Sequence, residues 1–224
     1  LGDFYEMFFD DEKTVSRELE LTLTGKNCGL EERAPMCGVP YHSSDGYIAK
    51  LLDRGYKVAI YEQTEDPAKA KGLVKRDVVR IVTPGTNTIK GAISEKENVY
   101  IASVFEADKK VGIAYGDITT GQMYVTSIND TFYFDNTISE LVKISPKEII
   151  LTEELKDRIG EDNLTSQVGG YINTIDESYY AIKTCTEAIL GQYGMVSLMP
   201  LNIEEKNESI AALGALLIYL IETK

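Results

Sequence analysis

The sequence predicts a two-domain protein of mixed α/β and α+β class, and three observations support this prediction. The 224 residues include 43% hydrophobic residues, enough for two modest hydrophobic cores. The order of predicted helices and strands changes on either side of a polar, helix-poor stretch at residues 87–98. Residues 1–90 contain 13 Lys and Arg against 15 Asp and Glu, whereas residues 91–224 contain 10 against 21. Two parts that differ so much in charge are typical of modules that bind different partners.

The first predicted domain, residues 1–86, has an α+β pattern with a mixed sheet. A strand is predicted within LGDFYEMFF, and a helix follows over Asp10–Thr24, where apolar residues recur at four-residue spacing. The other predicted elements are a polar loop from Gly25 to Arg33, a rigid and irregular path over Ala34–His42, a helix with Tyr47, Ile48, Leu51 and Leu52 on its apolar face, strands at Lys57–Gln63 and Asp77–Thr83, and a turn at Pro84–Thr86.

The second predicted domain, residues 99–224, follows the linker at residues 87–98 and has an α/β pattern. Its expected elements are strands at Val99–Phe105, Val111–Thr119 and Gln122–Ile128, a helix at Asn136–Ile144 with Ile138, Leu141 and Val142 inward, a strand at Glu148–Leu151, a helix at Glu153–Ile159, a looser stretch to Ile175, and helices near Tyr179–Leu190 and Glu208–Glu222. Three antiparallel strands followed by a helix that crosses back to a fourth strand predict a ribonuclease-H-like fold.

Cysteine, histidine and charge content exclude several classes of protein. The three cysteines include no pair at CxxC spacing, which is typical of a reduced, cytoplasmic protein. His42 is the single histidine, so a multi-histidine metal site is excluded. The apolar run Ile210–Ile221 is too short to span a bilayer, and a net charge of −13 argues against a chain that simply coats nucleic acid. Because the chain begins at Leu1, we expect it to be a fragment of a longer protein.

The opening stretch DFYEMFF surrounds one carboxylate with aromatic rings. On a strand, Phe4 and Glu6 project from the same face, about 7 Å apart. An exposed phenylalanine can act as a wedge between DNA base steps, and a mispaired base is easier to unstack than a paired one. Glu6 would repel the phosphates of ordinary duplex and recover part of that cost by hydrogen bonding to a displaced base. The alternative is a half-buried edge strand with Glu6 at its solvated end.

Two further segments are candidate ligand contacts. The loop AKAKGLVKRDVVR contains five basic residues and one acidic residue, which suits contacts to phosphates; the alternative is a solvated loop. The basic residues are Lys69, Lys71, Lys75, Arg76 and Arg80. In PMCGVPYH, two prolines and a glycine could hold Met36 or His42 against a ligand, and the alternative is a structural role for both side chains.

Three carboxylates raise the alternative of a metal-dependent nuclease. A ribonuclease-H-like nuclease gathers carboxylates around two metal ions, and Asp108, Asp117 and Asp176 are the candidates in the second half. Asp117 falls on a predicted strand, but Asp108 falls in a predicted turn and Asp176 at a predicted helix start. The alternative roles, in turns and helix caps, need no metal.

Four blocks of the first domain, GDFYEMFFDD, APMCGVPYHS, VAIYEQTEDP and VVRIVTPGT, resemble in order and spacing the N-terminal region of the bacterial MutS family of DNA mismatch repair proteins. In the second domain, GDITTGQMYV and ESIAALGALLIYLIET resemble the connector domain of that family. The resemblance implies that Phe4 stacks on the mispaired base and that Glu6 hydrogen-bonds to it. It also implies weaker DNA contacts at Met36, Lys75 and Arg76, and a connector that has a ribonuclease-H-like fold without nuclease activity and helps to recruit MutL.

Regions of the family that this sequence lacks limit what the chain can do alone. The segment before GDFYE and everything after the connector are missing, including the ATPase and dimerisation regions. We therefore expect no catalytic residues, metal site or cofactor in this fragment, since ATP and Mg²⁺ belong to the missing ATPase domain. The full-length protein should be a cytoplasmic, nucleoid-associated dimer, and the fragment should be a monomer. Three hypotheses stay open: a mismatch-recognition module with a connector, a metal-dependent nuclease, and a purely protein-interaction fragment.

Overall fold

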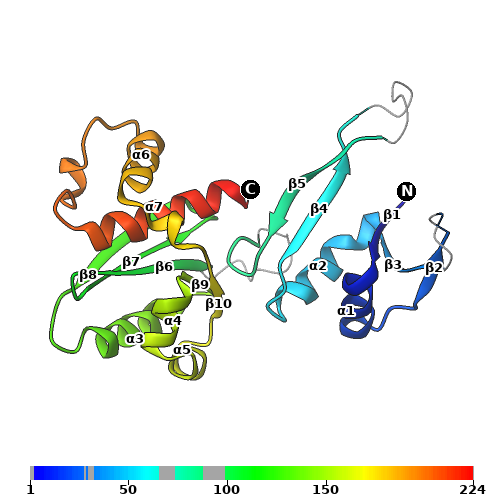
Figure 1. Cartoon of the computed structure of the whole chain (residues 1–224), viewed down its shortest axis with the longest axis horizontal. Coiled ribbons are helices and arrows are strands. Elements are labelled where there is room, and N and C mark those ends of the chain that lie inside the picture. The colour runs from blue at the N-terminus through cyan, green and yellow to red at the C-terminus, as the bar shows by residue number, and fades with distance from the viewer. Residues whose placement is uncertain (1–2, 28, 30–32, 66–73, 88–98, 224) are drawn as a thin grey trace. The chain divides into compact units, whose positions relative to one another are not determined.

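The computed structural model describes residues 3–27, 29, 33–65, 74–87 and 99–223, which form two compact units (Figure 1). The first unit contains the described residues up to Thr83 together with Asn87, and the second contains Pro84–Thr86 and the described residues from 99 onward. The predicted class, α/β and α+β with two domains, is confirmed. The predicted domain limits stay predictions, because residues 88–98 of the expected linker lie outside the described residues.

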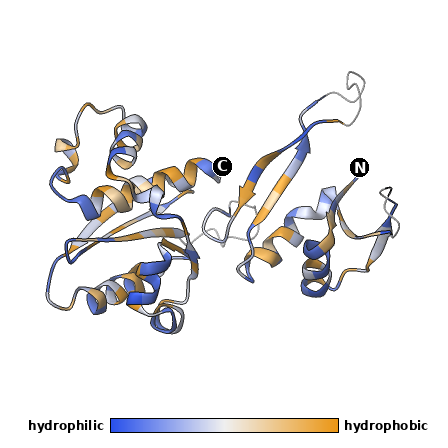
Figure 2. Ribbon diagram, in the orientation of Figure 1, coloured by the Kyte–Doolittle hydropathy of each residue, from blue (hydrophilic) through white to orange (hydrophobic). Residues whose placement is uncertain are grey.

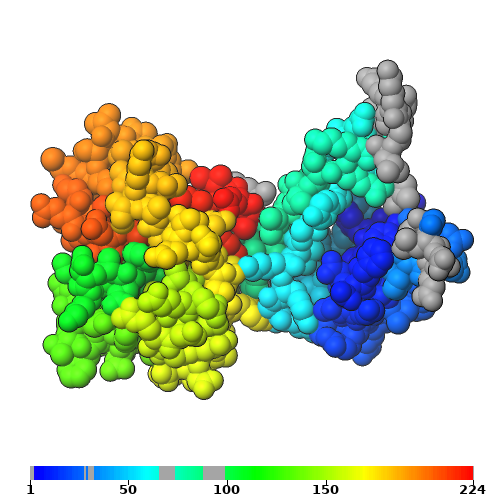
Figure 3. Space-filling model, viewed as in Figure 1, coloured from blue at the N-terminus to red at the C-terminus, as the bar shows by residue number. Residues whose placement is uncertain are grey.

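The first unit contains a three-stranded antiparallel sheet with the order β1-β3-β2 and a separate two-stranded ribbon, β4–β5. In chain order its elements are β1 (Phe4–Phe8), α1 (Phe9–Leu19), β2 (Thr24–Lys26), β3 (Ala34–Pro40), the short 3₁₀ helix η1 (Tyr41–Ser43), α2 (Ser44–Leu52), β4 (Val58–Gln63) and β5 (Arg76–Val82). A small core joins α2 to the ribbon through Ile48, Leu52 and Val82, against which Val58 and Ile60 pack. The ribbon extends away from the helices of its own unit (Figures 1 and 3).

The second unit is built on a five-stranded sheet with the order β10-β9-β6-β7-β8. Strands β6, β7 and β8 form the predicted antiparallel meander, and β9 and β10 continue the sheet parallel to β6. This is the mixed sheet of a ribonuclease-H-like layer. Its elements are β6 (Tyr100–Ala107), β7 (Lys110–Asp117), β8 (Gln122–Ile128), α3 (Tyr133–Ile144), β9 (Glu148–Leu151), α4 (Glu153–Ile159), α5 (Glu161–Gln167), β10 (Tyr171–Thr174), η2 (Glu177–Tyr180), α6 (Ile182–Tyr193), η3 (Met199–Leu201) and α7 (Asn207–Glu222).

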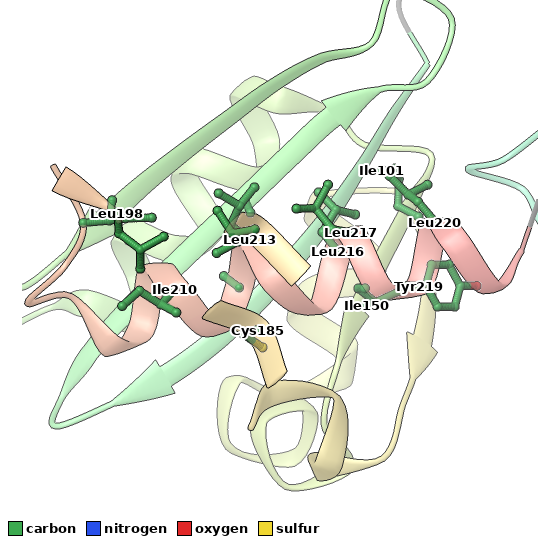
Figure 4. Close-up of a cluster of buried hydrophobic side chains, with 14 residues drawn as sticks. Ile101, Ile150, Cys185, Leu198, Ile210, Leu213, Leu216, Leu217, Tyr219 and Leu220 are labelled. Atoms are coloured by element: carbon green, nitrogen blue, oxygen red, sulfur yellow. The ribbon is translucent and has the colours of Figure 1, made fainter. Parts of the chain in front are cut away.

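Helices cover both faces of the five-stranded sheet. Helix α7 packs directly on one face and α6 packs against α7, whereas α3, α4 and α5 pack on the other face (Figure 1). Helix α7 is the most hydrophobic helix of the unit (Figure 2), and its side chains fill the core drawn in Figure 4. A Cβ atom at Gly112 of β7 would lie 2.1 Å from the carbonyl oxygen of Glu208, so glycine permits α7 to approach the sheet. Within the described residues, no helix is long and apolar enough to cross a membrane.

Two expectations for the first unit are wrong. The segment Ala34–His42 does not follow an irregular path, because Ala34–Pro40 forms the central strand β3. Its prolines are tolerated because each lies where β3 has a described neighbour on one side only: Pro35 opposite β2 and Pro40 opposite β1. The expected helix over Asp10–Thr24 ends at Leu19, and part of the expected polar loop forms β2.

Two expectations for the second unit are also wrong. The stretch before Ile175 was expected to be loose, yet it contains α5 and β10. Strand β10 exists because it pairs in parallel with β9. Val142 was expected to face inward from α3 but is exposed, whereas Ile138 and Leu141 are buried as expected.

Candidate functional site

The candidate binding face is one side of the β1-β3-β2 sheet. Strand β1 pairs with β3 so that Phe4 lies opposite Pro40, Glu6 opposite Gly38 and Phe8 opposite Met36. Directly opposed residues of an antiparallel pair project to the same face. The sheet therefore places Phe4, Glu6, Phe8 and Met36 on a common face, and Gly38 leaves the position opposite Glu6 without a side chain.

The Phe4 side chain is not part of a core, because 51% of its surface remains exposed. Its ring lies over the backbone of β3: a Cβ atom at Gly38 would lie 3.6 Å from Cδ1 of Phe4 and 3.3 Å from the carbonyl oxygen of Tyr5. A side chain at position 38 would crowd the carbonyl oxygen of Tyr5, whereas its distance from the ring is an ordinary van der Waals contact. The glycine therefore lets β1 and β3 approach closely beside the half-exposed Phe4.

Glu6 is paired with a lysine that sequence reasoning missed. The ammonium of Lys26 lies 2.5 Å from Oε2 of Glu6 and 5.5 Å from the centre of the Phe8 ring. Lys26 belongs to β2, within the segment expected to be a loop. The alternation of leucine and threonine in LTLT at residues 21–24 is a period-two signal that could have predicted a strand there.

Tyr5 projects from the opposite face of β1 and connects the strand to the rest of the unit. The Tyr5 hydroxyl donates a hydrogen bond to Glu62 of β4, and its ring lies 5.4 Å from the ring of Tyr41. Burial, and then the hydrogen bond and negative charge of Glu62, raise the pKa of Tyr5 well above its ordinary value, so the hydroxyl stays a donor at neutral pH. The backbone N–H of Tyr41 also donates to the carbonyl of Asp3 at 2.7 Å. These contacts anchor β1 through the face that carries Tyr5. Phe4 and Glu6 project from the other face.

The three weaker candidates divide between two places. Met36 is half-buried and shares the face of Phe4 and Glu6. Lys75 and Arg76 instead lie at the start of β5 on the separate ribbon, where both are exposed. The Lys75 ammonium lies 2.9 Å from Oδ2 of Asp77, and hydrogen bonds from Lys75 and Thr64 lower the pKa of that carboxyl. Lys69 and Lys71 of the basic loop lie outside the described residues.

The three carboxylates of the nuclease hypothesis do not form one site. Asp108 lies in the β6–β7 turn, whereas Asp117 lies at the far end of β7, about 24 Å along a strand that rises roughly 3.4 Å per residue. Asp176 caps η2 by accepting a hydrogen bond from the backbone N–H of Ser178 at 2.9 Å. A two-metal site needs its ligands around ions about 4 Å apart. The part of the chain that the structure describes holds no group of three or more His, Cys, Asp or Glu that could bind a metal ion.

Together, the small sheet with its open aromatic face and the five-stranded layer define a two-domain mixed α/β protein. Two protein-family models match the chain: MutS domain I matches residues 1–90, and MutS domain II matches residues 99–224. The chain belongs to the MutS family, as the resemblance predicted.

Curated relatives support the same assignment. The chain is 46% identical over 228 residues to the DNA mismatch repair protein MutS of Ruminiclostridium cellulolyticum, with 100% of this chain and 25% of that protein covered. It is 48% identical over 227 residues to the DNA mismatch repair protein MutS of Acetivibrio thermocellus, with 100% of this chain and 26% of that protein covered. The chain thus spans about a quarter of the length of the curated relatives it matches.

Proposed function

We propose that the full-length protein recognises mismatched or unpaired bases in duplex DNA and thereby initiates mismatch repair. Phe4 is the wedge that stacks on the mispaired base, and Glu6 accepts a hydrogen bond from that base. The observation that carries this proposal is the half-exposed Phe4 ring on the same face of the sheet as Glu6. The two relatives compared above, which are named as DNA mismatch repair proteins, support it.

The proposed selectivity follows from the cost of inserting a ring into DNA. Unstacking a base step costs a few kcal/mol, and less where pairing has already failed. Stacking of a base on an aromatic side chain contributes about 1–3 kcal/mol. Stacking on Phe4 therefore contributes the same free energy at any base step, but unstacking the base costs less at a mismatch. This difference in cost makes the protein bind mismatched DNA more tightly than matched DNA.

Glu6 adds a second difference between matched and mismatched DNA. Its carboxylate repels the phosphates of any duplex, which weakens binding to matched DNA. At a mismatch, a hydrogen bond from the displaced base offsets part of this repulsion. Met36 would contact the DNA beside Phe8 on the same face, and Lys75 and Arg76 would contact phosphates without reading sequence.

The second unit is proposed to act as a connector. It relays binding at the first unit to an ATPase domain of the full-length protein, where ATP and Mg²⁺ bind, and it contributes to recruiting MutL. Its excess of acidic over basic residues suits a surface for proteins better than a surface for DNA. On this proposal the fragment has no enzymatic activity of its own and is a monomer, and the full-length protein is a cytoplasmic dimer.

Binding of the full-length protein to a G·T duplex and to the matched homoduplex tests the role of Phe4. We expect Phe4→Ala to lower the affinity for the G·T duplex by about 10- to 100-fold, the value of one lost stacking contact, and to change homoduplex affinity less than threefold. Phe132→Ala is the matched control, because Phe132 is an exposed phenylalanine of the second unit, and it should change neither affinity. Equal losses on both duplexes would show that Phe4 only supports the fold.

A further inference from the structure

Lys26 is the charged residue of β2 that reaches the Glu6 carboxylate across the face of the sheet. Its ammonium lies 2.5 Å from Oε2 of Glu6 and 5.5 Å from the centre of the Phe8 ring. The ring attracts the cation through its negatively charged face, and the carboxylate attracts it directly. Two contacts from one strand, β1, therefore fix the position of the Lys26 ammonium.

The Lys26–Glu6 pair is partly shielded from solvent, unlike the Lys75–Asp77 pair on the β4–β5 ribbon. The side chain of Glu6 is 18% exposed and that of Lys26 is 32% exposed, whereas the Lys75–Asp77 side chains are 70% and 46% exposed. Partly buried charges are screened less by water and salt than exposed ones. The attraction of Lys26 therefore holds Glu6 in one orientation more strongly than an exposed lysine would.

We infer that Lys26 is a specificity-determining residue that positions Glu6 for the mispaired base, an inference that rests on the proposed function of Glu6. An ionised carboxylate offers about four acceptor positions, so a hydrogen bond from Lys26 does not prevent another from a base. With Lys26 in place, Glu6 meets the displaced base already oriented. Without it, the carboxylate must be ordered on binding, and that entropic cost falls only on the mismatched complex.

A ratio of affinities separates this role from simple attraction to DNA. Loss of the Lys26 charge removes attraction to phosphates, and it leaves the Glu6 charge uncompensated. Both effects weaken binding to matched and to mismatched duplexes alike, so they cancel in the ratio of G·T to homoduplex affinity. The orientation of Glu6 toward a displaced base affects only the affinity for the G·T duplex. Its loss therefore changes the ratio of the two affinities.

The test is a double-mutant cycle in the full-length protein, measured on G·T duplex and homoduplex. Lys26→Met keeps the apolar stem and removes the charge, and we expect it to lower the affinity ratio about three- to tenfold. In a Glu6→Gln background the same substitution should change the ratio less than twofold. Lys26→Arg, which also pairs with carboxylates, should keep the ratio within twofold of the wild type. Lys143→Met, which removes an exposed lysine of α3 whose ammonium lies 2.8 Å from Glu140, is the matched control and should leave the ratio unchanged.

An unchanged ratio in Lys26→Met would overturn the inference, and so would an equal fall of the ratio with Glu and with Gln at position 6. Thermal unfolding of Lys26→Met shows whether the variant remains folded, and the failure of Lys26→Arg to restore the ratio would also contradict a positioning role. The Phe4→Ala measurement distinguishes a failure of the inference about Lys26 from a failure of the proposed function. If Phe4→Ala abolishes mismatch preference and Lys26→Met does not alter the ratio, only the inference about Lys26 is wrong.

Discussion

Each unit of the chain contains a fully buried glutamate, and the two carboxylates have opposite surroundings. In the second unit, Glu148 of β9 accepts hydrogen bonds from the backbone N–H of Gly85 at 2.9 Å, from Asn173 at 3.0 Å and from the hydroxyl of Tyr219 at 2.7 Å. In the first unit, both carboxylate oxygens of Glu12 on α1 lack a hydrogen-bond partner in the described part of the chain. A buried polar group stabilises a fold only when its partners are present.

The two carboxylates lie in units that are held together differently. The Glu148 network joins four segments far apart in sequence, including the Pro84–Thr86 turn and helix α7, and so defines one arrangement of the second unit. The first unit has a smaller core and places an uncompensated carboxylate next to β3, where the Cys37 thiol lies 3.8 Å from the carbonyl oxygen of Glu12. Burial, and then the charge of Glu12, raise the pKa of that thiol. The comparison therefore predicts opposite effects when each glutamate is removed.

Glu148→Ala should have the largest effect. It leaves the Gly85 N–H, the Asn173 amide and the Tyr219 hydroxyl without this acceptor, and we expect the free energy of unfolding of the second unit to fall by about 3 kcal/mol or more. Urea unfolding followed by far-ultraviolet circular dichroism measures this loss. Glu154→Ala, an exposed change on α4, should stay within about 0.5 kcal/mol of the wild type. A loss for Glu148→Ala as small as that of the control would show that the network does not stabilise the unit.

Glu12→Met should act in the other direction. Methionine has a similar length and adapts to irregular space, and it removes a buried carboxylate that has no described partner. We expect the first unit to gain about 1–3 kcal/mol of stability, which native-state hydrogen exchange of the α1 amides measures. Lys13→Met changes an exposed residue of the same helix and should shift these amides by less than about 0.5 kcal/mol. Faster exchange in Glu12→Met than in the wild type would mean that the carboxylate stabilises the unit.

Local sequence signals predicted the elements whose structure is decided locally. The strand Glu148–Leu151 and the helix Glu153–Ile159 have the predicted limits, because an apolar run is followed directly by Thr152, whose hydroxyl caps the helix by accepting from the N–H of Leu155. Strands β2 and β10 were missed because they have three and four residues and depend on pairing with β3 and β9. The pairing itself leaves no signal within the paired run, although the LTLT alternation leading into β2 indicated extended structure there.

The candidate site was predictable to the extent that it lies on one strand. Alternation along β1 placed Phe4 and Glu6 on one face, and the family resemblance gave them roles that stay predictions. Lys26 could not be placed, because its approach to Glu6 requires β2 and β1 to flank the same strand, β3. The hydrogen bond between Gly85 and Glu148 was equally hidden, since 63 positions separate the two residues in sequence.

Backbone strain is the last and smallest difference between the units. In the described part of the second unit, the non-glycine residues with positive φ are polar and lie in turns or at helix ends: Asp108, Lys109, Ser145 and Asn202. In the first unit, Phe9 has a φ of 58° where β1 passes into α1, and its ring is 56% exposed. A bulky residue rarely adopts this conformation, because its Cβ atom approaches the following carbonyl oxygen.

A comparison of the stabilities of Phe9→Gly and Phe9→Ala measures this strain. Both substitutions remove the exposed ring, but only glycine removes the Cβ atom, so we expect Phe9→Gly to be more stable than Phe9→Ala by about 1 kcal/mol in urea unfolding. At Lys13, in the body of α1, the order should reverse, with alanine more stable than glycine by about 1 kcal/mol. If alanine were the more stable residue at both positions, the junction between β1 and α1 would carry no strain.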